Sequence, residues 1–190
     1  KLVFRYKTIG RENIPRAGEF GEQPVVFACN HVSFADPVIL WSVLFAYGNG
    51  CRFLARSSLF RPVIGGLIAR AGAIPIDPDT ADRKALKRAA SALKRGENLL
   101  IFPEGTRSRT GEMGPLLSGA SMLAMRGRVP VVPVYIAGRY RPLQRMKVII
   151  GAPLPFDDLL AEGVNKETCD RFTARMQDAF VRLRTQSEKI

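Results

Sequence analysis

The sequence is poor in acidic residues and in histidine. It contains 17 Asp and Glu against 29 Lys and Arg, which gives a formal net charge of +12, and it has one histidine in 190 residues. A charge of this size leaves much of the surface positive and attracts the phosphate groups of nucleic acids, anionic lipids or small ligands. Charge alone does not choose among these partners.

Cysteine is also scarce. Cys29, Cys51 and Cys169 are odd in number and lack the Cys-x-x-Cys spacing of metal sites. The sequence therefore predicts neither a disulfide framework nor a zinc site, and no other metal site is expected. A reducing, cytosolic environment follows from this cysteine usage.

Long apolar runs are missing as well. No run reaches the roughly 18 residues of a membrane-spanning helix, because 37–47 is too short and Arg70 interrupts 62–76. Any contact of this chain with a membrane is expected to be peripheral. The chain opens on Lys1 without a signal-peptide pattern, which leaves room for a fragment or processed form whose N-terminal membrane anchor is missing.

Short apolar runs bounded by turn-forming residues predict six strands. They cover residues 25–29, 52–55, 73–76, 99–102, 131–136 and 147–150. Pro75 and Pro133 count against two of these strands, because proline cannot donate to a strand ladder.

Three helices are predicted from caps and periodicity. Asp36 as N-cap and Pro37 as first helical residue begin an almost wholly apolar helix. Thr80 caps an amphipathic helix at 80–95, and another amphipathic helix begins near Asn165.

The alternation of strands and helices indicates the fold class. With strands too apolar to be half exposed, it predicts an α/β fold with a mixed or mainly parallel β-sheet flanked by helices on both faces. A length of 190 residues suits one domain, so residues 1–190 are expected to form a single domain.

Two polar stretches follow predicted strands. In the first, His31 lies five residues before Asp36, and a carboxylate at that spacing can fold back to fix the tautomer of the imidazole. The alternative is that Asp36 is only a helix cap and His31 a loop residue. The spacing alone does not decide between them.

The second stretch covers residues 102–109. Gly105 permits close approach of the backbone to a ligand, and Arg107 and Arg109 can grip a phosphate, so the stretch is typical of an anion-binding turn. The alternative is a polar turn with an internal ion pair between Glu104 and Arg107.

Residues 72–77 and 129–134, taken alone, could be core strands. Taken in order with the two polar stretches, they resemble the glycerolipid acyltransferase family that includes 1-acyl-glycerol-3-phosphate acyltransferases. The four matching blocks are N-H-x4-D at 30–36, G-x-I-x-I-D at 72–77, F-P-E-G-T-R-S at 102–108 and V-P-V-x-P-V at 129–134. Residues 8–15 also look like the lead-in that often follows the N-terminal membrane helices of this family.

The resemblance implies roles for individual residues. His31 would be the general base and Asp36 the carboxylate that orients and stabilises it, while backbone N–H groups near Gly105 and Thr106 would face the developing oxyanion. The acceptor phosphate would be held by Glu104, Gly105, Thr106 and Arg107. Secondary candidates are Asn30, Ser33, Gly72, Asp77, Arg83, Arg109 and Pro133.

Two departures from the family pattern concern the acceptor. Pro78 follows the second block where the family often has arginine, and Arg83 is a speculative substitute. The family also commonly has a lysine just before the glycine that follows the third block, whereas residues 116–119 read Leu-Leu-Ser-Gly. These departures leave the acceptor more open than the reaction type.

The resemblance implies transfer of a fatty acyl group from acyl-CoA or an acyl carrier protein to a lysophospholipid, first of all lysophosphatidic acid, which gives phosphatidic acid. It implies no acyl-enzyme and no permanently bound cofactor. The net charge of +12 and the lack of a spanning run add the expectation of peripheral attachment to an anionic membrane surface, on its cytoplasmic face. One alternative is another lysolipid or lipid-linked acceptor, and another is a lipid-binding scaffold without activity. A basic nucleic-acid-binding module would leave the four blocks unexplained and lacks clustered aromatic residues for stacking, so no nucleic acid is expected.

The helix at 80–95 is strongly basic. It can be a solvated face, a contact for lipid headgroups, or a site for the phosphates of the donor. The apolar segments 37–46 and 62–68 could insert into lipid, although burial in the core is the expected fate of most of their side chains.

Overall fold

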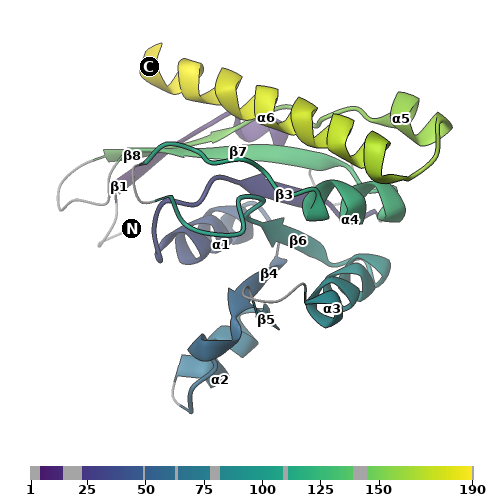
Figure 1. Ribbon diagram of the computed structural model, residues 1–190. Coiled ribbons are helices and arrows are strands. Elements are labelled where there is room, and N and C mark those ends of the chain that lie inside the picture. The colour runs from purple at the N-terminus through teal and green to yellow at the C-terminus, as the bar shows by residue number, and fades with distance from the viewer. Residues whose placement is uncertain are drawn as a thin grey trace.

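A seven-stranded, mostly parallel sheet forms the centre of the computed structural model (Figure 1). The structure describes residues 5–14, 23–48, 50–62, 64–77, 82–108, 111–138 and 145–189. In sheet order the strands are β1 (Arg5–Ile9), β8 (Arg145–Ile150), β7 (Val131–Ala137), β3 (Val26–Cys29), β6 (Asn98–Ile101), β4 (Cys51–Arg56) and β5 (Ala73–Ile76). Only the pairing of β7 with β8 is antiparallel among the described strands.

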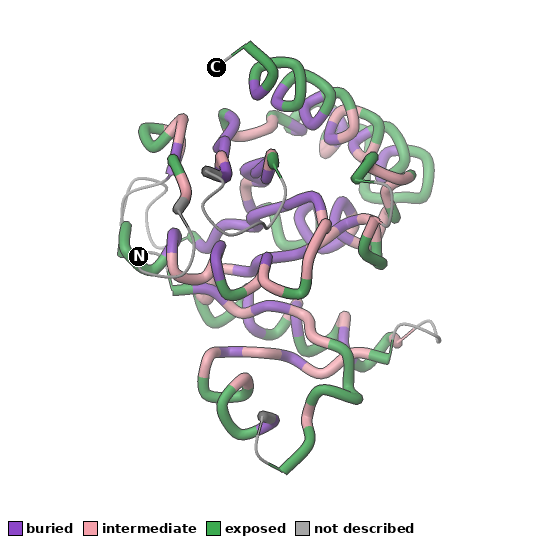
Figure 2. Tube along the Cα trace, turned by 90° about the vertical axis from the view of Figure 1, so that its left-hand side faces the viewer, coloured by how far each residue is buried: buried purple, intermediate pink, exposed green. Residues whose placement is uncertain are grey.

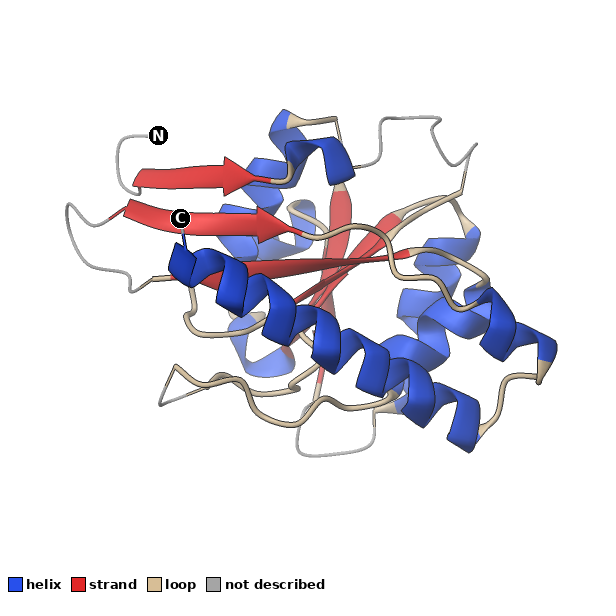
Figure 3. Ribbon diagram, turned by 90° about the horizontal axis from the view of Figure 1, so that it is seen from above, coloured by secondary structure: helices blue, strands red, loops and turns tan. Residues whose placement is uncertain are grey.

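Helices cover both faces of the sheet. They are α1 (Asp36–Ala46), α2 (Ile64–Arg70), α3 (Arg83–Lys94), α4 (Gly119–Gly127), α5 (Asp157–Ala161) and α6 (Lys166–Lys189). Helices α3, α4 and α6 share one buried cluster with Val26 and Ala28 of β3, whereas α1 packs with Phe27 and Cys29 on the other face. Figure 3 shows α6 lying across the strands, and Figure 2 shows burial concentrated along the sheet.

The structure confirms the predicted mainly parallel α/β fold and all six predicted strands. Pro75 lies in β5, the last strand of the sheet, where a missing N–H is tolerated. Pro133 lies inside β7, so the expectation that it argued against a strand was wrong there. The prediction missed β1, whose sequence RYKTI is too polar to resemble a buried strand.

Two predicted helix starts differ from the observed ones. Ala35 occupies the N-cap position of α1, and Asp36 is already its first residue, so the prediction of Asp36 as N-cap was wrong. Asp82 caps α3 by accepting a hydrogen bond from the Ala85 backbone N–H at 2.9 Å. Thr80, the expected cap, lies outside the described residues.

The carboxyl ends of β3, β4, β5, β6 and β7 meet at one edge of the sheet, because these strands run parallel. Active sites in open parallel sheets gather at this edge. The loops that follow β3 and β6 there carry the first and third sequence blocks.

Candidate active site

His31 and Asp36 are in direct contact at the carboxyl edge. The His31 Nδ1 and Asp36 Oδ2 atoms are 2.8 Å apart. The Asp36 side chain is 0% exposed, while the His31 side chain is 17% exposed. A buried carboxylate on Nδ1 fixes the orientation of the ring and leaves Nε2 as the nitrogen that can take a proton.

The loop between β3 and α1 folds around the Asp36 carboxylate. Its Oδ2 atom accepts hydrogen bonds from the backbone N–H groups of Val32 and Ser33, both at 2.7 Å. The Ser33 hydroxyl in turn accepts a hydrogen bond from the Ala35 N–H at 3.2 Å. Since Pro37 in the first turn of α1 fixes φ, the carboxylate is held in place at the start of a rigid element.

The backbone of His31 is bonded to the loop after β6. Its N–H donates to Glu104 Oε1, and its carbonyl accepts from the Ser108 N–H, both at 2.8 Å. The second oxygen of Glu104 accepts the Gly114 N–H at 3.0 Å. The first and third sequence blocks therefore form one site, in which the Glu104 side chain positions His31 by accepting the His31 backbone N–H.

Phe102 packs against the imidazole. The two ring centroids lie 4.2 Å apart with an interplanar angle of 25°. Sequence reasoning did not give Phe102 a role of its own. Its position as the first residue after β6, the strand next to β3, is the signal that could have identified it.

Asn30 lies just before the histidine and is only 3% exposed. Its side chain accepts the Ile136 N–H at 2.7 Å and donates to the Ile136 carbonyl at 3.1 Å. These bonds tie the end of β3 to β7 across the sheet. Asn30 thus supports the backbone that presents His31.

Arg107 lies beside the His31 loop. Its guanidinium carbon is 3.4 Å from the centroid of the Phe34 ring, a cation–π contact. Phe34 is itself 70% exposed. A guanidinium stacked in this way keeps its in-plane N–H groups directed outward, where they can bind a phosphate.

Gly105 forms the turn that carries Thr106 and Arg107 outward. Its φ is +70°, and a Cβ there would lie 2.7 Å from Leu117 Cδ1. The Gly105 N–H donates to the Phe102 carbonyl at 3.1 Å, so this donor is engaged within the turn. For the Gly105 N–H to face a developing oxyanion, as predicted, this turn bond would have to be given up.

The secondary candidates do not all reach this site. Ser33 and Asn30 do, through the contacts above. Gly72 lies at the opposite end of the sheet, just before β5, and Pro133 lies inside β7 beside Ala28.

The remaining secondary candidates lie near the start of α3 or outside the described residues. Asp77 follows β5 and donates its N–H to Asp82 Oδ2 at 3.1 Å, and Arg83 begins α3. Arg109 lies outside the described residues.

Cys29 is the buried thiol closest in sequence to the histidine. Burial, together with the negative charges of Asp36 and Glu104, raises the pKa of Cys29 well above its ordinary value. The thiol therefore stays protonated at neutral pH and is a poor nucleophile. Cys29 is therefore not an activated nucleophile beside His31.

Comparison with known proteins shows which sequences this chain is similar to. Residues 5–137 match the family model described as Acyltransferase. The chain is 37% identical over 139 residues to the chloroplastic 1-acyl-sn-glycerol-3-phosphate acyltransferase BAT2 of Brassica napus, covering 70% of this chain and 38% of that protein. It is 32% identical over 154 residues to the 1-acyl-sn-glycerol-3-phosphate acyltransferase of Bacillus subtilis, covering 78% of this chain and 73% of the relative.

A solved structure shares the fold. The 1-acyl-sn-glycerophosphate (LPA) acyltransferase PlsC from Thermotoga maritima superposes with a TM-score of 0.72 at 22% sequence identity. The match covers 98% of this chain and 73% of that one. The chain thus spans little more than a third of the plant relative but most of the two bacterial proteins.

Proposed function

The chain belongs to the acyltransferase family, and on that premise we propose that it transfers a fatty acyl group from an acyl thioester to lysophosphatidic acid, forming phosphatidic acid. The observation that carries the proposal is the contact between His31 and the buried Asp36, held beside Arg107 at the carboxyl edge of the sheet. The names of the relatives support the choice of acceptor.

The reaction needs a base and no covalent enzyme intermediate. His31 Nε2 takes the proton of the acceptor hydroxyl while that oxygen bonds to the thioester carbonyl carbon. The tetrahedral oxyanion then collapses, the C–S bond breaks, and the imidazolium returns its proton to the departing thiolate. Asp36 stabilises the imidazolium between these steps.

Arg107 is the proposed contact for the acceptor phosphate. It can form two parallel N–H bonds to phosphate oxygens, and the Thr106 hydroxyl lies exposed beside it. Glu104 uses both oxygens on backbone N–H groups, and a carboxylate would repel a phosphate. We therefore propose that Glu104 positions His31. Its expected contact with the acceptor phosphate stays a prediction.

The acceptor is a membrane lipid, and apolar side chains are exposed near the site. Phe34 lies in the His31 loop, Val38 lies in the first turn of α1, and Leu117 lies against Gly105. Helix α1 buries Ile39, Leu40, Val43 and Leu44, in line with the expectation for most of its side chains. It leaves Trp41 partly exposed and Val38 and Phe45 on the surface. No helix among the described residues has the length and apolar character to cross a bilayer. Peripheral contact through this face would bring His31 to the lipid, while the side of the membrane stays a prediction.

The test is acyl transfer to a panel of acceptors by the wild-type chain and by His31→Ala. Lysophosphatidic acid should be acylated, and His31→Ala should lower kcat by roughly 10²–10⁴-fold, the usual contribution of a general base. Equal rates for the two chains would remove the mechanism. Failure on lysophosphatidic acid together with success on another lysolipid would remove the proposed acceptor.

A second arm isolates the phosphate contact. Arg107→Gln should raise KM for lysophosphatidic acid far more than KM for monoacylglycerol, which has the hydroxyl but no phosphate. Arg182→Gln removes the same charge from an exposed position of α6 and serves as the matched control. An equal effect of the two substitutions would show that Arg107 acts only through the overall charge.

A further inference from the structure

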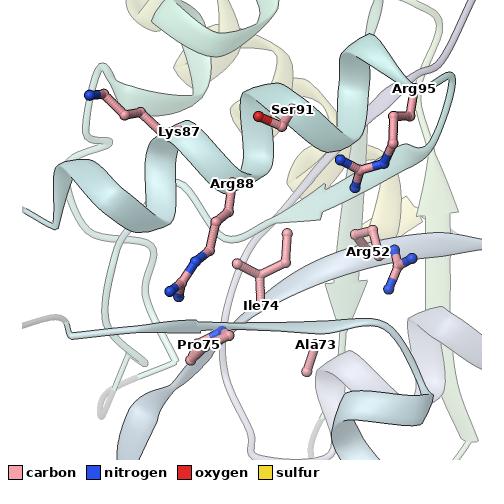
Figure 4. Close-up of a pocket in the computed structure, with 8 residues that line it drawn as sticks. All are labelled: Arg52, Ala73, Ile74, Pro75, Lys87, Arg88, Ser91 and Arg95. Carbon is pink, nitrogen blue, oxygen red and sulfur yellow. The ribbon is translucent and has the colours of Figure 1, made fainter.

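A basic pocket lies between α3 and the β4–β5 end of the sheet (Figure 4). Its cavity volume is about 480 Å³, within the range of small-molecule sites. Arg52, Lys87, Arg88 and Arg95 line it together with the Ser91 hydroxyl, and residues 73–75 supply an apolar wall. None of these side chains takes part in the His31 site.

The charges of the pocket have two separate centres. In Figure 4, Arg88 reaches toward Pro75, whereas Arg52 and Arg95 gather at the Ala73 end. Glu97 orients these last two: its Oε1 accepts from Arg52 Nη2 at 2.9 Å and its Oε2 from Arg95 Nη2 at 2.8 Å. Asp82, the cap of α3, also interacts electrostatically with Arg88. Four cations against these two carboxylates leave the pocket positive, with an apolar stretch between its two ends.

Helix α3 carries this charge against its own stability. Residues 83–95 contain no acidic residue, and Arg83 and Lys84 lie in the first turn, where cations oppose the helix dipole. Lys84 and Arg88, four residues apart, repel each other on one face. An anionic ligand would relieve this repulsion. A face that only contacts solvent has no need for so many basic residues in one place.

The pocket is within reach of His31 along the sheet. Ala73, Phe53, Leu100 and Phe27 stand at one level in neighbouring strands. Pro75 is therefore two residues short of the level of His31 and three strands away. Strand spacings make this separation roughly 16 Å, a distance that an extended phosphopantetheine arm can span.

We propose that this pocket binds the phosphorylated adenosine of a coenzyme A thioester, whose arm then runs along the carboxyl edge to His31. The inference rests on the proposed acyl transfer and names its donor. Two cationic centres fit the 3′-phosphate and the diphosphate, and the apolar wall with its arginines fits the adenine ring. A concave pocket favours a nucleotide over the convex surface of an acyl carrier protein.

The first test is calorimetric binding of adenosine 3′,5′-bisphosphate to the His31→Ala chain, which keeps the pocket intact. Adding Lys87→Gln and Arg88→Gln should weaken binding by roughly tenfold or more, the loss of charge-assisted contacts. Lys84→Gln with Lys94→Gln removes the same charge from exposed positions of the same helix outside the pocket lining. An equal loss in both pairs, or equally tight binding of inorganic phosphate, would overturn the proposal.

The second test compares donors in the active chain. Lys87→Gln with Arg88→Gln should raise KM for acyl-CoA and leave KM for acyl-pantetheine, which lacks the nucleotide, unchanged. If KM rose for an acyl carrier protein but not for acyl-CoA, the pocket would serve the carrier and the proposal would be wrong. Nucleotide binding without any acyl transfer would refute the proposed reaction while supporting the pocket, so the two failures are distinguishable.

Discussion

One oxygen of Asp36 accounts for most of the order in the His31 loop. It accepts two backbone N–H groups and contacts the imidazole, all within 2.8 Å. The sequence left open whether Asp36 capped a helix or partnered the histidine. The structure shows the histidine contact and places the cap position one residue earlier, at Ala35. A carboxylate at the first helical position can bond backward into the loop, which explains the five-residue spacing.

Asp36→Asn tests the charge of this group separately from its shape. The amide oxygen can still accept the N–H groups of Val32 and Ser33, but the negative charge that stabilises the imidazolium is lost. We expect kcat for acyl transfer to fall by about 10²-fold or more, within the range of general-base contributions. Thermal unfolding followed by circular dichroism checks that the fold is kept. An unchanged kcat in a folded variant would contradict the role of Asp36.

Gly105→Ala tests the turn that presents Arg107. A left-handed φ of +70° should cost an alanine about 1–2 kcal/mol of unfolding free energy. The added Cβ also meets Leu117, but that side chain is exposed and can move away. Denaturant unfolding measures the loss, and adding Leu117→Ala should restore little of it. Full recovery in the double variant would show that the contact, and not the backbone, sets the cost.

At the scale of residues, the sequence predicted contacts between side chains that lie close together in the chain. The contact of His31 with Asp36 follows from local spacing. The stacking of Phe102 on His31 and the bond from His31 to Glu104 join residues more than 70 positions apart. They depend on the register of β3 against β6, which no local pattern specifies. Family resemblance identified the block around Glu104 but not what its carboxylate contacts.

At the scale of elements, apolar runs predicted the strands because buried parallel strands carry continuous β-branched sequences. The apolar runs did not predict β1, because this strand pairs on one side only, with β8, and its Lys7 is exposed. Helix starts were predicted less well. Asp82 caps α3, two residues after the predicted cap, because the path of the preceding loop decides which polar side chain reaches the first free N–H groups of the helix.

The contact between α5 and α6 gives an element-scale prediction. Arg175 Nη1 donates to Asp158 Oδ1 at 2.7 Å, and this arginine lowers the pKa of Asp158 from 3.8 to about 2. A lowered pKa means that the pair stabilises the fold above pH 3.8 and that this stabilisation is lost as the pH falls through about 2. Asp158→Asn should therefore destabilise slightly near neutral pH and not at all at the acid end.

Denaturant unfolding of the wild-type chain and of Asp158→Asn, near neutral pH and at the acid end, measures this difference. The matched control is Asp157→Asn, which removes the same charge from the same turn of α5. Asp157 has no ion pair among those the described residues form. A loss for Asp158→Asn that persisted unchanged at low pH would show that the hydrogen-bond geometry, not the charge, matters.

At the scale of the whole molecule, the positive net charge and the exposed apolar side chains both suit a reaction on a membrane lipid. The net charge of +12 attracts anionic lipid from a distance, with each basic residue near the surface contributing about 1 kcal/mol. Phe34, Val38, Leu67 and Leu117 are each at least 61% exposed. Composition showed the first property but not the second, because the same apolar helix sequence can be wholly buried.

Vesicle binding should separate these two contributions. Co-sedimentation with phosphatidylserine vesicles should fall as NaCl rises from about 0.1 M to 1 M, since the screening length shrinks from about 10 Å to 3 Å. Val38→Ser should weaken binding at both salt concentrations by roughly fivefold, about 1 kcal/mol for apolar surface that no longer enters lipid. Val181→Ser is the control, because Val181 is 54% exposed on α6, across the sheet from α1. Equal losses in the two variants would show that the face around His31 is not the one that meets the membrane.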